Sequence, residues 1–65
     1  LFPTMIAMAS DPRVNVRARA VTRLIGIPPI SLKPYLPQLQ AVRATLTNAR
    51  EQQLMDRIIV AATKA

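Results

Sequence analysis

Asp11, Glu51 and Asp56 are the only acidic residues of this 65-residue chain, and neither histidine nor cysteine accompanies them. Acid–base catalysis needs two groups held close together, and Asp56 has Arg57 beside it but no second acid or base at helical spacing. Asp11 and Glu51 are better used as helix-capping groups. We therefore expect no catalytic residue and no enzyme activity.

Metal and phosphate sites lack their usual residues as well. Without cysteine or histidine the chain has no typical zinc ligands. Gly26 is the only glycine, so there is no glycine-rich loop to hold a phosphate. The sequence therefore predicts no cofactor and no metal.

Basic residues dominate the charge of the chain. Nine Lys and Arg residues, seven of them arginine, face three acids and give a net charge of +6. Such a balance suits a nucleic acid or an acidic protein partner. Only two residues are aromatic, Phe2 and Tyr35, so the chain lacks the stacking platform of single-strand binders.

Capping residues and prolines divide the chain into predicted helices. The first apolar segment ends at Ser10, and Asp11 can then cap a second helix that starts at Pro12 or Arg13. Val16, Ala20, Leu24 and Ile27 recur on one face of that helix, which makes it amphipathic. Gly26 and the prolines after it end the helix and begin an extended link.

Two further helices are predicted after the link. Pro37 favours a start near Tyr35 for the third helix, because a proline is tolerated in the first turn. The spacing of Asn48 and Glu51 fits a capping box, in which Asn48 caps the fourth helix and Glu51 reaches back to it. The inner face of the fourth helix carries Leu54, Ile58 and either Ala61 or Ala62. No segment alternates with a period of two, so the predicted fold class is all-α.

A set of residues around the second helix resembles a known repeat. The pattern Asp-x4-Val-Arg-x2-Ala-x3-Leu is formed by Asp11, Val16, Arg17, Ala20 and Leu24. With Pro12 after the aspartate and a proline early in the preceding helix, it resembles the HEAT repeat of armadillo-type α-solenoids. The resemblance implies two antiparallel helix pairs stacked as part of a solenoid. It also implies that Asp11 and Arg17 join a ladder of hydrogen bonds between neighbouring repeats.

Arg17 stands out from the residues alone as well. By helical angle it lies about 20° from Leu24, on the edge of the apolar face, where a charge is costly unless it is paired. The alternative is a solvated arginine whose aliphatic part covers the edge of that face.

The chain divides into a HEAT-like helix pair (1–27), a proline-rich link (28–34) and a second, degenerate helix pair (35–65). Aligning 35–37 with 1–3 gives a period of 34 residues, which is typical of helical repeats. Aligning Leu54 with Val16 instead places Ala49 and Met55 at the two ladder positions. On that alignment the second pair has no ladder of its own.

The resemblance implies a non-catalytic, protein-binding scaffold that belongs to a longer intracellular chain, cytoplasmic or nuclear, and packs against neighbouring repeats. Arg19 and Arg23, spaced four residues apart on the second helix, are candidate partner-binding residues, with a solvated helix edge as the alternative. Contact with nucleic acid or ribosomal RNA, or a structural role in a large assembly, remain alternative functions. No stretch has the roughly 20 apolar residues of a membrane span, and no signal-peptide pattern is present.

Overall fold

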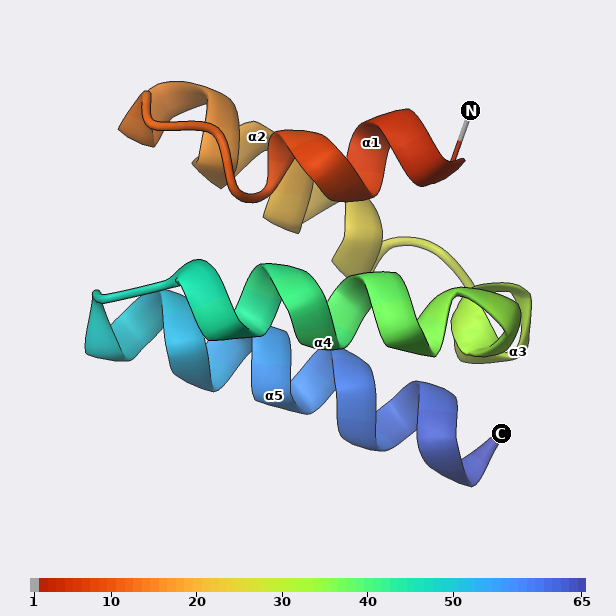
Figure 1. The fold of residues 1–65 in the computed structure, drawn as a ribbon. Helices are drawn as coiled ribbons and strands as arrows, with labels where there is room; N and C mark the ends of the chain where they lie inside the picture. Colours follow the sequence, from red (N-terminus) through yellow and green to blue (C-terminus); the bar gives the residue numbers. More distant parts are fainter. Residues whose placement is uncertain (1) are drawn as a thin grey trace.

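The computed structural model describes residues 2–65, and every element within them is helical (Figure 1). In chain order the helices are α1 (Phe2–Met8), α2 (Val14–Ile25), α3 (Pro29–Leu32), the short 3-10 helix η1 (Lys33–Tyr35), α4 (Leu36–Thr45) and α5 (Ala49–Lys64). Residues 2–65 contain no strand, so the predicted all-α class is confirmed for this part of the chain. Leu1, where the predicted first pair begins, lies outside the described residues.

The long helices form two antiparallel pairs, α1 with α2 and α4 with α5 (Figure 1). α1 lies along α4 and runs in the same direction, and α2 packs against α5, which also runs in the same direction as α2 (Figure 1). α3 packs across α5 and fills the space between the pairs near the C-terminal end of α2. Each helix of the first pair thus has a counterpart beside it in the second pair.

Prolines set the beginnings of α1 and α4 in the same way. Pro3 is the second residue of α1, and Pro37 is the second residue of α4. A proline is tolerated there because the first backbone N–H groups of a helix have no partner within the helix. Tyr35 is the N-cap of α4, as the sequence predicts from Pro37.

The link 28–34 differs from its prediction, because most of it is helical. Pro28 is extended, with φ −55° and ψ 132°, but Pro29 is the first residue of α3 and Pro34 lies in η1. Both prolines occupy early positions, where their fixed φ favours a helical turn. The prolines that suggest an extended link from the sequence thus lie at the beginnings of short helices.

α2 begins later than predicted. Its first residue is Val14, and Arg13 is the N-cap in an extended conformation. The Asp11 carboxylate accepts the backbone N–H of Arg13 at 2.8 Å, so it forms a turn before the helix rather than capping the helix itself. Gly26 ends α2 as predicted, in a right-handed conformation with φ −78°.

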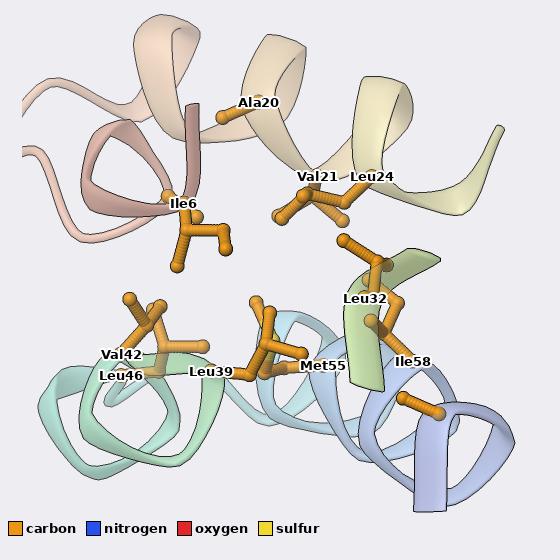
Figure 2. Close-up of a cluster of buried hydrophobic side chains, with 12 residues drawn as sticks. Ile6, Ala20, Val21, Leu24, Leu32, Leu39, Val42, Leu46, Met55 and Ile58 are labelled. Atoms are coloured by element: carbon orange, nitrogen blue, oxygen red, sulfur yellow. The ribbon is translucent and has the colours of Figure 1, made fainter. Parts of the chain in front are cut away.

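The core between the pairs is wholly apolar among the described residues (Figure 2). Its buried residues come from all five α-helices and the turns that follow α1 and α4: Ile6, Ala9, Ala20, Val21, Leu24, Leu32, Leu39, Val42, Leu46, Met55, Ile58 and Ala62. The stripe predicted for α2 is rotated, because Val16 is only half-buried and Ile27 lies beyond the helix, whereas Val21 is buried. On α5, Met55 is buried and Leu54 half-buried.

Shortening a side chain in this core should destabilise the protein far more than the same change outside it. Leu39 is 0% exposed and Ile30 is 62% exposed. We expect Leu39→Ala to cost about 2–5 kcal/mol through lost burial and the cavity left behind, and Ile30→Ala to cost less than about 0.5 kcal/mol. Urea unfolding followed by circular dichroism measures both. Equal effects would show that the two pairs do not share one core.

Candidate functional site

The side chain of Arg17 connects the two helix pairs. Its Nε donates to Glu51 Oε1 at 3.0 Å, and its Nη2 donates to Glu51 Oε2 at 3.3 Å. Its Nη1 donates to the backbone carbonyls of Asp11 at 2.9 Å and Pro12 at 3.0 Å. One guanidinium therefore holds the turn before α2 and the first turn of α5. The planar fork of arginine suits this two-sided arrangement, because its N–H groups point in fixed directions.

Arg17 and Glu51 are both partly buried, so their hydrogen bonds must offset the loss of hydration. The side chains of Arg17 and Glu51 are 21% and 19% exposed, so each has lost most of its water. A charge in such a place is costly unless it is paired and hydrogen-bonded. The four bonds of Arg17 meet that requirement, and the solvated alternative does not describe this residue.

The fourth predicted helix supplies the carboxylate from its first turn. Asn48 is the N-cap of α5, and its Oδ1 accepts the backbone N–H groups of Arg50 at 2.9 Å and Glu51 at 3.1 Å. These bonds fix the backbone from which the Glu51 side chain extends. A negative charge is also favourable there, because the helix dipole is positive at its N-terminus.

The predicted capping box is therefore only half formed. Asn48 caps α5, but the Glu51 carboxylate points to Arg17 and does not bond the backbone N–H of Asn48. The Glu51 carboxylate can bond either the backbone N–H of Asn48 or the guanidinium of Arg17, and it bonds Arg17. The bidentate contact with a charged guanidinium is the stronger one, because charge-assisted bonds exceed neutral ones.

Asp11 contributes to the bridge through its backbone rather than its side chain. Its carbonyl accepts a bond from Arg17, while its carboxylate binds Arg13 Nε at 3.0 Å and Nη2 at 3.2 Å. The side-chain hydrogen bond from Arg13, with the backbone bond from the same residue, lowers the pKa of the Asp11 carboxyl from its ordinary value of 3.8. The same contact raises the pKa of Arg13.

Arg17 and Glu51 are separated by 34 residues, the same separation as Pro3 and Pro37. The buried residues Val21 and Met55 follow this spacing too, as do Leu24 and Ile58. Arg17 and Glu51 thus occupy corresponding positions of the two helix pairs. The period of 34 residues between the prolines aligns Arg17 with Glu51. The alignment of Leu54 with Val16 instead aligns Arg17 with Met55.

Two clefts lie along the contact between α2 and α5. One has a volume of about 390 Å³, and its lining includes the apolar residues Val21, Ile25 and Leu54, the Arg17–Glu51 bridge and Arg50. The other, of about 190 Å³, continues past Ile25 and Leu54 toward α3. The smaller cleft is lined mainly by apolar side chains, whereas the larger one has apolar and polar side chains in similar number.

The two predicted partner-binding residues are not part of these clefts. Arg19 and Arg23 are exposed on α2. At about 100° per residue they lie on the side of α2 that faces away from α5. The structure therefore separates them from the Arg17 bridge and from both clefts.

Comparison with protein-family models, curated proteins and solved structures finds no match to this chain. Within residues 2–65, no cluster of three or more His, Cys, Asp or Glu residues could hold a metal ion. In the same part of the chain, no helix combines the length and apolar character needed to cross a membrane.

Removing the guanidinium of Arg17 should destabilise the protein. Arg17→Met leaves the Glu51 carboxylate and two carbonyls without a donor, and we expect a loss of more than about 1 kcal/mol. Arg19→Met is the matched control, because it makes the same change on an exposed position of the same helix and should stay within about 0.5 kcal/mol. Urea unfolding of both variants gives the comparison. Small effects at both positions would contradict the bridge.

The lowered pKa of Asp11 predicts acid sensitivity. Because the folded state holds this proton less tightly than the unfolded state, the contribution of Asp11 is present above pH 3.8 and is lost as pH falls through the folded-state pKa. We expect Asp11→Asn to lower stability at neutral pH and to flatten its decline below about pH 4. Thermal unfolding from pH 2 to pH 7 tests this. Parallel pH profiles for the two proteins would exclude the contribution.

Proposed function

We propose that this chain is a segment of a HEAT-type helical repeat array that acts as a non-catalytic, protein-binding scaffold. The observation that carries the proposal is the bond between Arg17 and Glu51, which joins corresponding positions of two helix pairs 34 residues apart. The shared directions of α1 with α4 and of α2 with α5 support it (Figure 1). Stacked helix pairs with a regular spacing are the basis of helical solenoids.

The use of the acidic residues supports a non-catalytic role. Within residues 2–65, each carboxylate is engaged by an arginine: Asp11 by Arg13, Glu51 by Arg17, and Asp56 by Arg43. A general acid or base needs a carboxyl group free to exchange a proton with a substrate. The acids of this chain instead hold turns and helices in place.

Exposed apolar side chains support a place within a longer array. Val14, Ile25, Ile30 and Val60 are between 49% and 62% exposed, and they lie on α2, α3 and α5. Repeats of a solenoid bury such residues against the neighbouring repeats. We propose that neighbouring repeats of the same chain cover some of them in an intracellular protein.

Nucleic-acid contact remains the second candidate because of the net charge of +6. The three ion pairs of residues 2–65 leave six cations without an acidic partner: Arg19, Arg23, Lys33, Arg50, Arg57 and Lys64. Arg19 and Arg23 lie on one side of α2, whereas Arg50 and Arg57 line the clefts on its other side. This division disfavours one continuous phosphate-binding surface.

The array proposal predicts weak cooperativity for the 65-residue chain alone. We expect a helical circular dichroism spectrum but a broad thermal transition at modest temperature, because apolar faces lack their neighbours. Extending the chain by one native helix pair on either side should sharpen the transition and raise its midpoint. A sharp transition at high temperature in a dilute monomer, unchanged by the extension, would contradict the proposal.

A further inference from the structure

The two clefts between α2 and α5 form one continuous surface. Ile25 and Leu54 line both of them, so the clefts meet at this pair of residues. Val21 borders the end near the Arg17 bridge, and Ile58 and Ala61 border the end near α3. We call this surface the α2/α5 groove. Its floor, where the two clefts meet, is formed by the apolar residues Ile25 and Leu54, and Ile25 is 56% exposed.

Basic side chains of α5 lie along one edge of the groove. Arg50 lines one end and Arg57 the other. They are seven residues apart on α5, which places them on nearly the same side of the helix and about 10 Å apart along its axis. Lys64 continues the row seven residues later. The sequence alone suggests basic residues scattered over several helices, but these three follow one side of α5.

Within residues 2–65, no acidic side chain forms an ion pair with the arginines at this edge of the groove. The one carboxylate that lines the groove belongs to Glu51, and Arg17 already binds both of its oxygens. Asp56 lies one residue from Arg57 but binds Arg43 at 2.8 Å on the side of α4. The three ion pairs within residues 2–65 include neither Arg50 nor Arg57. The groove therefore combines an apolar floor with an uncompensated positive edge.

We propose that the α2/α5 groove binds an acidic amphipathic helix of a partner protein. Apolar residues of the partner helix contact Ile25 and Leu54, and two of its acidic residues, seven positions apart, pair with Arg50 and Arg57. The spacing agrees because a second helix has the same rise per residue. A groove between two helices accepts a third by packing side-chain ridges into it. This assignment rests on the proposed scaffold function and names its surface and its partner class.

The groove fits a protein better than a nucleic acid. A phosphate backbone gains from the arginines but not from Ile25, Leu54 and Ala61, which it would leave uncovered. Bases need aromatic rings or similar platforms for stacking. The two aromatic rings of the chain, Phe2 and Tyr35, instead contact each other edge to face, with centroids 5.9 Å apart, and neither lines the groove.

A pool of synthetic helical peptides tests this assignment. Each peptide has roughly 20 residues, a varied apolar stripe and glutamates seven positions apart beside it. A second pool is identical but carries lysine in place of each glutamate. We expect the acidic pool to yield binders by fluorescence anisotropy and the lysine pool to yield none. Absence of binders in the acidic pool, or equal binding by both pools, overturns the proposal.

Variants then locate the binding site. Arg50→Glu with Arg57→Glu should weaken the selected peptide at least about tenfold, because both contacts become repulsive. Arg19→Glu with Arg23→Glu changes the net charge equally on the far side of α2 and should change affinity less than about threefold. Ile25→Ser should also weaken binding several-fold, since it removes an exposed apolar contact without disturbing the core. Equal losses with both arginine pairs, or no loss with Ile25→Ser, overturn the assignment to this groove.

A structured RNA hairpin serves as the competing ligand. Binding through phosphates predicts a steep loss of affinity with rising salt and similar losses with either arginine pair. If the RNA binds more tightly than every acidic peptide, the proposal is wrong. Failure of the groove assignment is distinguishable from failure of the array proposal, because the latter is decided by whether added native repeats raise the unfolding midpoint.

Discussion

The arrangement of the two helix pairs depends on how one partly buried cation finds its partners. Arg17 extends from α2 at the edge of the apolar face, with its side chain only 21% exposed. Water cannot solvate it fully there, so protein groups must accept its hydrogen bonds. Two carbonyls of the preceding turn and the Glu51 carboxylate of the other pair do so. Since desolvation offsets much of the attraction between buried charges, we expect the contact to select one arrangement of the pairs as well as to stabilise it.

The apolar core and the Arg17–Glu51 bridge have different roles. Burial of residues such as Leu24, Leu39 and Met55 drives the pairs together, but the hydrophobic effect has no preferred direction. A helix could slide along its neighbour and still bury similar area. The two-bond contact between Arg17 and Glu51 has fixed geometry and therefore selects one register for α2 against α5. That register determines which side chains form the floor of the α2/α5 groove.

Local signals in the sequence predict much of this fold, because their causes lie within a few residues. The cap at Asn48, the stop at Gly26 and the late start required by Pro37 all depend on backbone groups nearby. The partner of Glu51 could not be found in this way, since a capping box and a contact with Arg17, 34 residues away, use the same carboxylate. The one sequence signal that agrees with the Arg17 contact is the 34-residue spacing of Pro3 and Pro37. Likewise α3 lies in a stretch whose prolines suit either a link or a helix start, and packing against α5 decides between them.

The central claim is that Arg17 and Glu51 act together across the two pairs, and a double-mutant cycle measures this directly. The free energy of unfolding is determined for the protein, for Arg17→Met, for Glu51→Met and for the double variant. Direct contact predicts a coupling free energy of at least about 0.5 kcal/mol between the two positions. A parallel cycle of Arg17 with Asp56, which binds Arg43 instead, should be additive within about 0.3 kcal/mol. Additivity in the Arg17–Glu51 cycle as well would contradict the claim that this bridge joins the helix pairs.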